Sequence, residues 1–220
     1  MTITPESVKE LLTSEDFGDR IKGINQLRHL ERAIAFELVQ PLLTDTNTRV
    51  RYAAVSQLDT LGKENLEQSL ALLRDRLFHD SEPDVQAAAA DALGGLKLSV
   101  AFADLEKVYY ETSDWLLQFS IVAALGELGD TRSFTLLAEA LTSENNLMKT
   151  AAIGSFGELG DERAIPLLTP LVTDPDWQVR YRLAQALGRL GGSQAYSTLE
   201  KLATDAIEQV AVEAKNNLNG

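Results

Sequence analysis

Residues 176–191 read DWQVRYRLAQALGRLG, and apolar side chains recur in this stretch with the spacing of one helix face. With Val179 as position 0, leucines stand at positions +4, +8 and +11, which share one side of an α-helix. A short polar residue, Asp174, lies at position −5, where its side-chain oxygen can cap a helix or close a turn. The stretch therefore predicts an amphipathic helix that follows a tight polar turn.

The same pattern occurs seven times, at intervals of 31 to 35 residues. Position 0 is occupied by Asp19, Val50, Val85, Leu117, Met148, Val179 and Val210. Position −5 is occupied by Ser14, Asp45, Asp80, Thr112, Ser143, Asp174 and Asp205, all short and polar. A chance apolar rhythm would not also keep these polar residues in register, so the repeat is real.

Second apolar segments lie between the repeated helices and predict a first helix for each unit, at 33–43, 65–78, 99–111, 132–142, 163–172 and 194–203. Expected N-caps are Asp130, Asp161 and Ser193, while Pro41, Pro166 and Pro170 should bend or delay their helices. Left-handed glycines should end the second helices at Gly62, Gly129, Gly160 and Gly191. These features predict an all-α protein, an α-solenoid of about seven helical hairpins in one domain, 1–220. The unit resembles the HEAT repeat.

In such solenoids the second helix of each hairpin lines the inner curve, with positions +2, +5 and +9 opposite the core. These columns are aromatic, aliphatic or glycine rather than charged, which favours a binding strip over a solvated face. Alternatively, tight curvature buries the strip against neighbouring helices. The candidate groove residues, with two flanking arginines, are Tyr52, Asp59, Phe119, Val122, Ile153, Arg180, Tyr181 and Arg182.

The +1 column is polar from the second repeat to the sixth and predicts bonds to the loop acid of an adjacent repeat. Its members include Arg51, Gln86, Gln118, Lys149 and Arg180. Arg182 stands at +3, where the four preceding repeats have the small residues Ala53, Ala88, Ser120 and Ala151. It is interpreted either as an anion contact or as part of a salt bridge at the rim.

Composition excludes several classes of function. The net charge of −13 opposes nucleic-acid binding, which needs clustered Lys and Arg. No cysteine is present, and neither His29 nor His79 belongs to a metal-binding pair, so no metal site is expected. The N-terminus does not read as a secretory signal, and no apolar run could cross a membrane. A cytoplasmic protein without a recognisable catalytic residue is predicted.

The chain also resembles the E/F-type phycobilin lyase family of cyanobacteria and its relatives in phycobilisome degradation. The resemblance lies in the length and in the units LGELGD at 125–130 and FGELGD at 156–161. It implies phycobiliprotein partners (phycocyanin or allophycocyanin subunits), association with the phycobilisome, and phycocyanobilin as a ligand, without a tightly bound cofactor. Lyase-type activity is implied but left open. The alternative is a non-catalytic adaptor that binds a partner protein in the same groove.

Overall fold

The computed structural model describes residues 3–219, which form α-helices, short 3₁₀ turns and no strand. The α-helices are α1 (Pro5–Leu12), α2 (Phe17–Gln26), α3 (Arg32–Val39), α4 (Thr48–Leu61), α5 (Leu66–His79), α6 (Pro83–Gly95), α7 (Phe102–Glu111), α8 (Trp115–Leu128), α9 (Phe134–Leu141), α10 (Asn146–Leu159), α11 (Ile165–Leu168), α12 (Trp177–Leu190), α13 (Ser193–Leu202) and α14 (Glu208–Asn219). None of these helices is long and apolar enough to span a bilayer.

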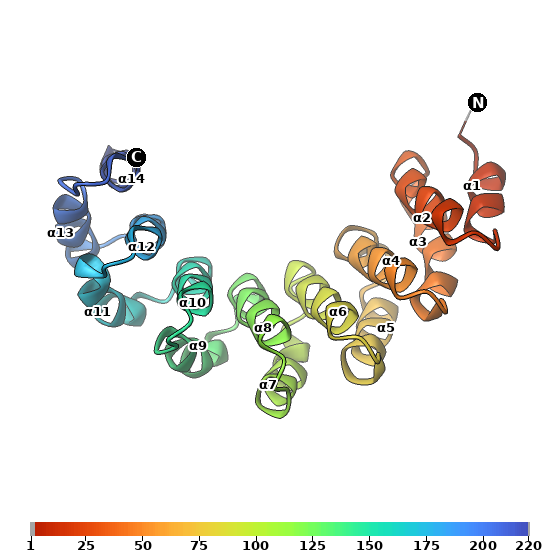
Figure 1. Ribbon diagram of the computed structural model, residues 1–220, viewed down its shortest axis with the longest axis horizontal. Helices are drawn as coiled ribbons and strands as arrows, with labels where there is room; N and C mark the ends of the chain where they lie inside the picture. Colours follow the sequence, from red (N-terminus) through yellow and green to blue (C-terminus); the bar gives the residue numbers. More distant parts are fainter. Residues whose placement is uncertain (1–2, 220) are drawn as a thin grey trace. The chain divides into compact units, whose positions relative to one another are not determined.

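The helices form seven consecutive hairpins, α1/α2 to α13/α14, as the repeat predicts. The chain separates into two compact units, one ending at Ser120 and the other beginning at Ile121. Within the first unit, α4 packs between α2 and α6; within the second, α12 packs between α10 and α14. The first helices form a separate layer in each unit (Figure 1). The predicted all-α solenoid of helical hairpins is confirmed.

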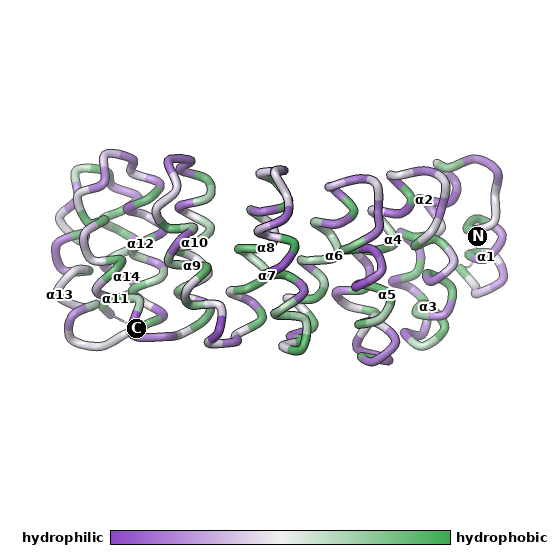
Figure 2. The backbone as a smooth tube through the Cα atoms, turned by 90° about the horizontal axis from the view of Figure 1, so that it is seen from below, coloured by the Kyte–Doolittle hydropathy of each residue, from purple (hydrophilic) through white to green (hydrophobic). Residues whose placement is uncertain are grey.

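The core is built from the apolar columns of the second helices. Positions 0, +4 and +8 of α12, which are Val179, Leu183 and Leu187, are fully buried, as are the equivalent residues of α4. Hydrophobic and hydrophilic segments alternate along the helices in Figure 2, as expected when one side of each helix is buried. Removing these side chains from water supplies the main stabilisation of each hairpin stack.

The seven residues at position −5 all make the same turn. Each side-chain oxygen accepts a hydrogen bond from the backbone N–H two residues later. In the first repeat Ser14 accepts from the Asp16 N–H, and in the last repeat Asp205 accepts from the Ile207 N–H. A second polar residue two positions on, such as Asn145 or Asp176, caps the following helix. The turn function predicted for this column is confirmed.

The helix ends agree with the sequence-based predictions except at Gly62 and Ser193. Gly129, Gly160 and Gly191 have φ near +70°, +68° and +67°, as expected for glycines that end helices. Gly62 instead has φ −62°, because the chain continues from α4 into the 3₁₀ turn Gly62–Glu64. The Gly62 carbonyl accepts a hydrogen bond from the Ser69 hydroxyl.

The first helices show the predicted effects of proline. Pro41 and Pro170 lie in the 3₁₀ segments Gln40–Thr44 and Thr169–Thr173, and Pro166 lies in the first turn of α11. Asp130 and Asp161 cap their segments as predicted. The prediction for Ser193 is wrong, because α13 already begins there and Gly192 takes the cap position.

A ladder of ion pairs joins consecutive repeats. The +1 residue of one repeat reaches the −5 acid of the next, in the pairs Arg20–Asp45, Arg51–Asp80, Lys149–Asp174 and Arg180–Asp205. Arg180 also donates at 2.7 Å to the Asp174 carbonyl of its own repeat. The predicted bond between the +1 column and the adjacent loop acid is confirmed for Arg51, Lys149 and Arg180. These side chains therefore set the stacking of the hairpins.

The last pair makes a pH prediction. Hydrogen bonds from the Arg180 guanidinium hold the pKa of Asp205 below its ordinary 3.8, against the opposing effect of burial. A depressed carboxyl pKa stabilises the folded state above the unfolded-state pKa, and this stability is lost as pH falls through the folded pKa. We expect Asp205→Asn to cost about 1–2 kcal/mol at pH 7 and progressively less below about pH 4. Urea unfolding of both proteins from pH 7 to pH 3 measures the difference, and a difference independent of pH contradicts the assignment.

Candidate functional site

The second helices are buried on more sides than the sequence analysis expects. All six apolar residues of the +5 column are buried: Ile24, Val55, Ala90, Val122, Ile153 and Ala184. The prediction that Val122 and Ile153 line an open groove is therefore wrong. In α4 and α12, first helices lie against one side and a second helix lies on each flank, so position +5 packs sideways between repeats.

The glycine column at +9 also has a different role from the predicted one. A methyl group added at Gly157 of α10 would lie 2.9 Å from the Cα atom of Ala186 on α12, and one added at Gly126 would lie 2.5 Å from the Cα atom of Ser155 on α10. These glycines let adjacent second helices approach at backbone distance. They do not open a groove.

In α10, α12 and α14, the residues at positions −2, −1, +2 and +3 of each helix form a stripe that is exposed or half-buried. Residues at −2 and +2 are four apart and lie on one side of the helix. In α12 this stripe carries Trp177 at −2 and Tyr181 at +2, whose ring centroids are 6.5 Å apart with the rings at 67°. Trp177 is 41% exposed, although large aromatic side chains are usually well buried.

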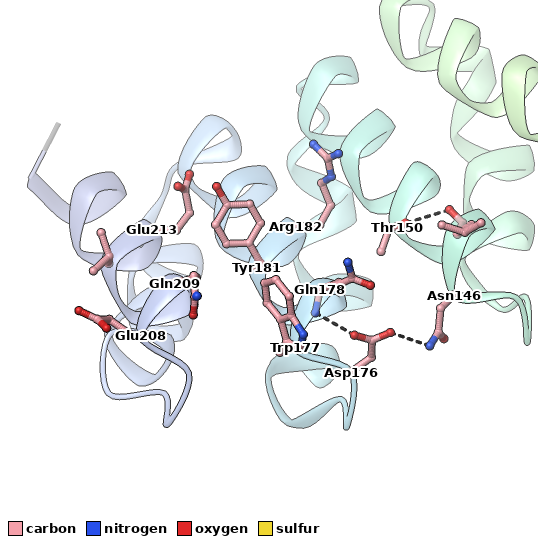
Figure 3. A pocket seen from close by; sticks show the side chains of 12 residues that line it. Asn146, Thr150, Asp176, Trp177, Gln178, Tyr181, Arg182, Glu208, Gln209 and Glu213 are labelled. Carbon is pink, nitrogen blue, oxygen red and sulfur yellow. Dashed lines mark hydrogen bonds between the residues drawn. The ribbon is translucent and has the colours of Figure 1, made fainter.

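The stripes of α10, α12 and α14 enclose a pocket of about 720 Å³, called here the second-helix pocket. Figure 3 shows Trp177 and Tyr181 at its centre, between side chains of α14 on one side and α10 on the other. Leu147 and Val212, 56% and 47% exposed, add apolar walls. The full lining is Asn146, Leu147, Thr150, Asp176, Trp177, Gln178, Tyr181, Arg182, Glu208, Gln209, Val212 and Glu213.

Hydrogen bonds fix part of the polar rim. Asp176 accepts from the Asn146 amide at 2.8 Å and from the Gln178 N–H at 2.9 Å, as drawn in Figure 3. The Glu213 carboxylate raises the pKa of the Tyr181 hydroxyl, because the phenolate form would be repelled. Tyr181 therefore stays neutral and can donate a hydrogen bond at neutral pH.

Of the predicted groove residues, Tyr181 and Arg182 line the second-helix pocket. Arg182 extends over Gly154 of α10, and its guanidinium donates to Gln185 at 3.0 Å. It forms no ion pair within residues 3–219, so the alternative of a salt bridge at the rim is not observed. Arg180 does not line the pocket, because Asp205 and the Asp174 carbonyl engage its guanidinium.

The remaining predicted residues lie in the first unit. Tyr52 is 48% exposed and Asp59 is exposed on α4, while Phe119 is half-buried in α8. Their positions do not test whether these three residues bind a ligand, so that role stays a prediction.

The sequence analysis missed Trp177, although a signal was available. Both tryptophans of the chain, Trp115 and Trp177, stand at position −2, four residues before an aromatic residue at +2. Extending the helix face by one turn toward the N-terminus would have found this pair. Val212 stands at +2, in the same column as Tyr181. Glu208 lacked such a signal, since its importance comes only from lining the pocket beside α12.

The geometry defines a class of protein, namely a helical-repeat scaffold with an exposed aromatic pocket on its second helices. The family model for HEAT repeats matches residues 4–93, 70–157 and 136–218. The chain therefore belongs to the HEAT-repeat family. Among curated proteins, none matches its sequence.

Solved structures share the fold at low identity. The complex of CpcE and CpcF of phycocyanin lyase from Nostoc sp. PCC7120 matches with a TM-score of 0.67 and 22% identity, over 100% of this chain and 95% of that one. A HEAT-like repeat protein from the archaeon Thermococcus onnurineus NA1 matches with a TM-score of 0.58 and 17% identity, over 100% and 97%. An engineered protein matches at 0.60 and 20%, over 98% and 68%. Such a widespread fold does not define a function.

Proposed function

We propose that this chain binds a phycobiliprotein, namely a phycocyanin or allophycocyanin subunit, through the second-helix pocket. The observation that carries the proposal is the aromatic pair within this pocket, in which Trp177 is exposed and Tyr181 is half-buried. Large aromatic side chains in a pocket are typical anchors of protein interfaces. The choice of partner is supported by the likeness to the phycocyanin lyase complex along the whole chain. The sequence units at 125–130 and 156–161, which resemble those of the phycobilisome-degradation protein NblB, point to the same partner.

The proposal includes the pigment. Phycocyanobilin is flat and largely apolar and carries two propionates, so its rings fit against Trp177 while one propionate meets Arg182. The pigment belongs to the partner and is contacted there, rather than being held as a resident cofactor. Detachment of the bilin during phycobilisome breakdown is the lyase-type activity that the proposal adds to binding.

A non-catalytic adaptor is the second candidate, and one observation favours it. The pocket carries the carboxylates of Asp176, Glu208 and Glu213 against the single guanidinium of Arg182. This excess of negative charge suits a side chain of a partner protein better than a pigment with two propionates.

Mixing the protein with phycocyanin, allophycocyanin and free phycocyanobilin separates the two candidates. We expect a complex with a phycobiliprotein at micromolar concentration, weakened at least about tenfold by Trp177→Ala, because the aromatic anchor is lost. A changed bilin absorption spectrum, or released pigment, supports handling of the chromophore. Binding without any spectral change supports the adaptor.

Tyr196→Ala is the matched control, since Tyr196 is 44% exposed on α13, in the other helix layer. It should leave binding unchanged. Failure to form a complex with either phycobiliprotein at tens of micromolar, together with an unchanged spectrum, would reject the proposed partner.

A further inference from the structure

The second-helix pocket combines apolar surface with an unbalanced charge. Three carboxylates against one guanidinium leave a net charge of −2 around Trp177, Leu147 and Val212. The whole chain carries −13, so long-range attraction also favours a cationic partner.

The three carboxylates differ in how far they are already engaged. Asp176 accepts hydrogen bonds from the Asn146 amide and from the Gln178 N–H at the start of α12, so both of its carboxylate oxygens are occupied. Glu213 accepts from Asn217 at 3.2 Å. Glu208, exposed in the first turn of α14, has no hydrogen-bond or ion-pair partner among residues 3–219. The unsatisfied negative charge therefore lies on the α14 side of the pocket. In Figure 3, Glu213 lies beside Tyr181, and Glu208 lies farther from the aromatic residues of α12, beyond Gln209.

The aromatic residues supply the other half of a cation site. Trp177 and Tyr181 meet edge to face, which leaves part of the indole surface exposed. Indole is the best aromatic partner for a cation, and guanidinium groups stack on it more often than ammonium groups do. Arg182 does not occupy this position, because it extends over Gly154 of α10.

We propose that the second-helix pocket takes an arginine side chain that a partner protein presents between apolar residues. The guanidinium lies on Trp177 and pairs with Glu208, with Glu213 adding attraction, while the flanking apolar residues contact Leu147 and Val212. The inference rests on the protein partner of the proposed function and not on its pigment, because the guanidinium occupies the face of Trp177 that the bilin rings would otherwise take. An acidic or phosphorylated segment is disfavoured, because it would face uncompensated carboxylates.

Two synthetic peptides test this charge preference, acetyl-Leu-Arg-Leu-amide and the same peptide with citrulline, which keeps the shape of arginine without its charge. Trp115→Phe leaves Trp177 as the only tryptophan, so its fluorescence reports binding at the pocket. We expect the arginine peptide to bind at least about fivefold more tightly than the citrulline peptide, with the preference falling as salt is added.

Variants locate the effect. Glu208→Gln combined with Glu213→Gln should abolish the preference for arginine, whereas Glu200→Gln, an exposed acid on α13, should leave it intact. Equal binding of both peptides, no binding of either at about 1 mM, or an equal loss with Glu200→Gln overturns the inference. Because no phycobiliprotein is used, these results are independent of the proposed partner. A protein that prefers the arginine peptide but ignores phycocyanin and allophycocyanin retains this inference and loses the proposed function.

Discussion

Asp80→Ala is expected to destabilise the unit that ends at Ser120 by about 3–5 kcal/mol. The Asp80 side chain is 1% exposed and accepts from Arg51 through Nε and Nη2, both at 2.9 Å. It also accepts from Arg76 at 3.2 Å and from the Glu82 N–H at 3.1 Å. Alanine would leave the nearly buried guanidinium of Arg51 without its carboxylate and that of Arg76 with the exposed Asp75 alone. Urea unfolding followed by circular dichroism measures the loss.

Asp75→Ala is the matched control, because Asp75 also bonds to Arg76 but is 53% exposed. An ion pair open to water contributes little, so this change should cost less than about 1 kcal/mol. Burial raises the pKa of Asp80, yet hydrogen bonds from Arg51 and Glu82 outweigh it and hold that pKa below the usual range. Similar losses in both variants would contradict a special role for Asp80.

Gly157→Ala is expected to destabilise the second unit by about 2–3 kcal/mol, although alanine favours helices by about 1 kcal/mol over glycine. The new methyl group would lie 2.9 Å from the Cα atom of Ala186, so α10 and α12 would have to separate. The two nearest atoms are Cα and Cβ of Ala186, which cannot move aside as the end of a flexible side chain could. Thermal and urea unfolding measure the change.

Gly154→Ala provides the comparison on the same helix. A methyl group there lies 3.5 Å from the nearest atom, Cδ of Arg182, which is an ordinary contact. The gain in helix propensity should then leave stability unchanged or raise it by up to about 1 kcal/mol. If both variants lose stability equally, the close approach at Gly157 is not what limits the substitution.

Local rules explain why the fold was predictable. The apolar columns around Val50 and Val179, and the turn residues Asp80 and Asp205, act within a few residues along the chain. The period of the repeat also predicted that a +1 arginine meets the acid of the next turn, since each repeat places the same groups at the same offset. The Arg51–Asp80 and Arg180–Asp205 pairs confirm this reasoning.

The site was less predictable, because exposure depends on what lies beside a helix. Ile153 stands on the side of α10 away from the first helices, yet a neighbouring second helix buries it completely. Gly157 was interpreted as an opening and is instead a point of close contact. Trp177 was overlooked because the helix face was counted from position 0 instead of from the capped N-terminus.

The sequence by itself determined that this protein is a stack of about seven helical hairpins, with polar turns in register and arginine–aspartate pairs between repeats. These features follow from side-chain spacing and from hydrogen bonds that span short distances along the chain. Only the tertiary structure decided that Trp177 remains exposed and Tyr181 half-buried, while Val122 and Ile153 are fully buried. It also decided that Glu208 lines the same pocket as the aromatic pair. The physical reason is that burial and charge balance depend on neighbouring helices, which the periodicity of a single helix does not specify.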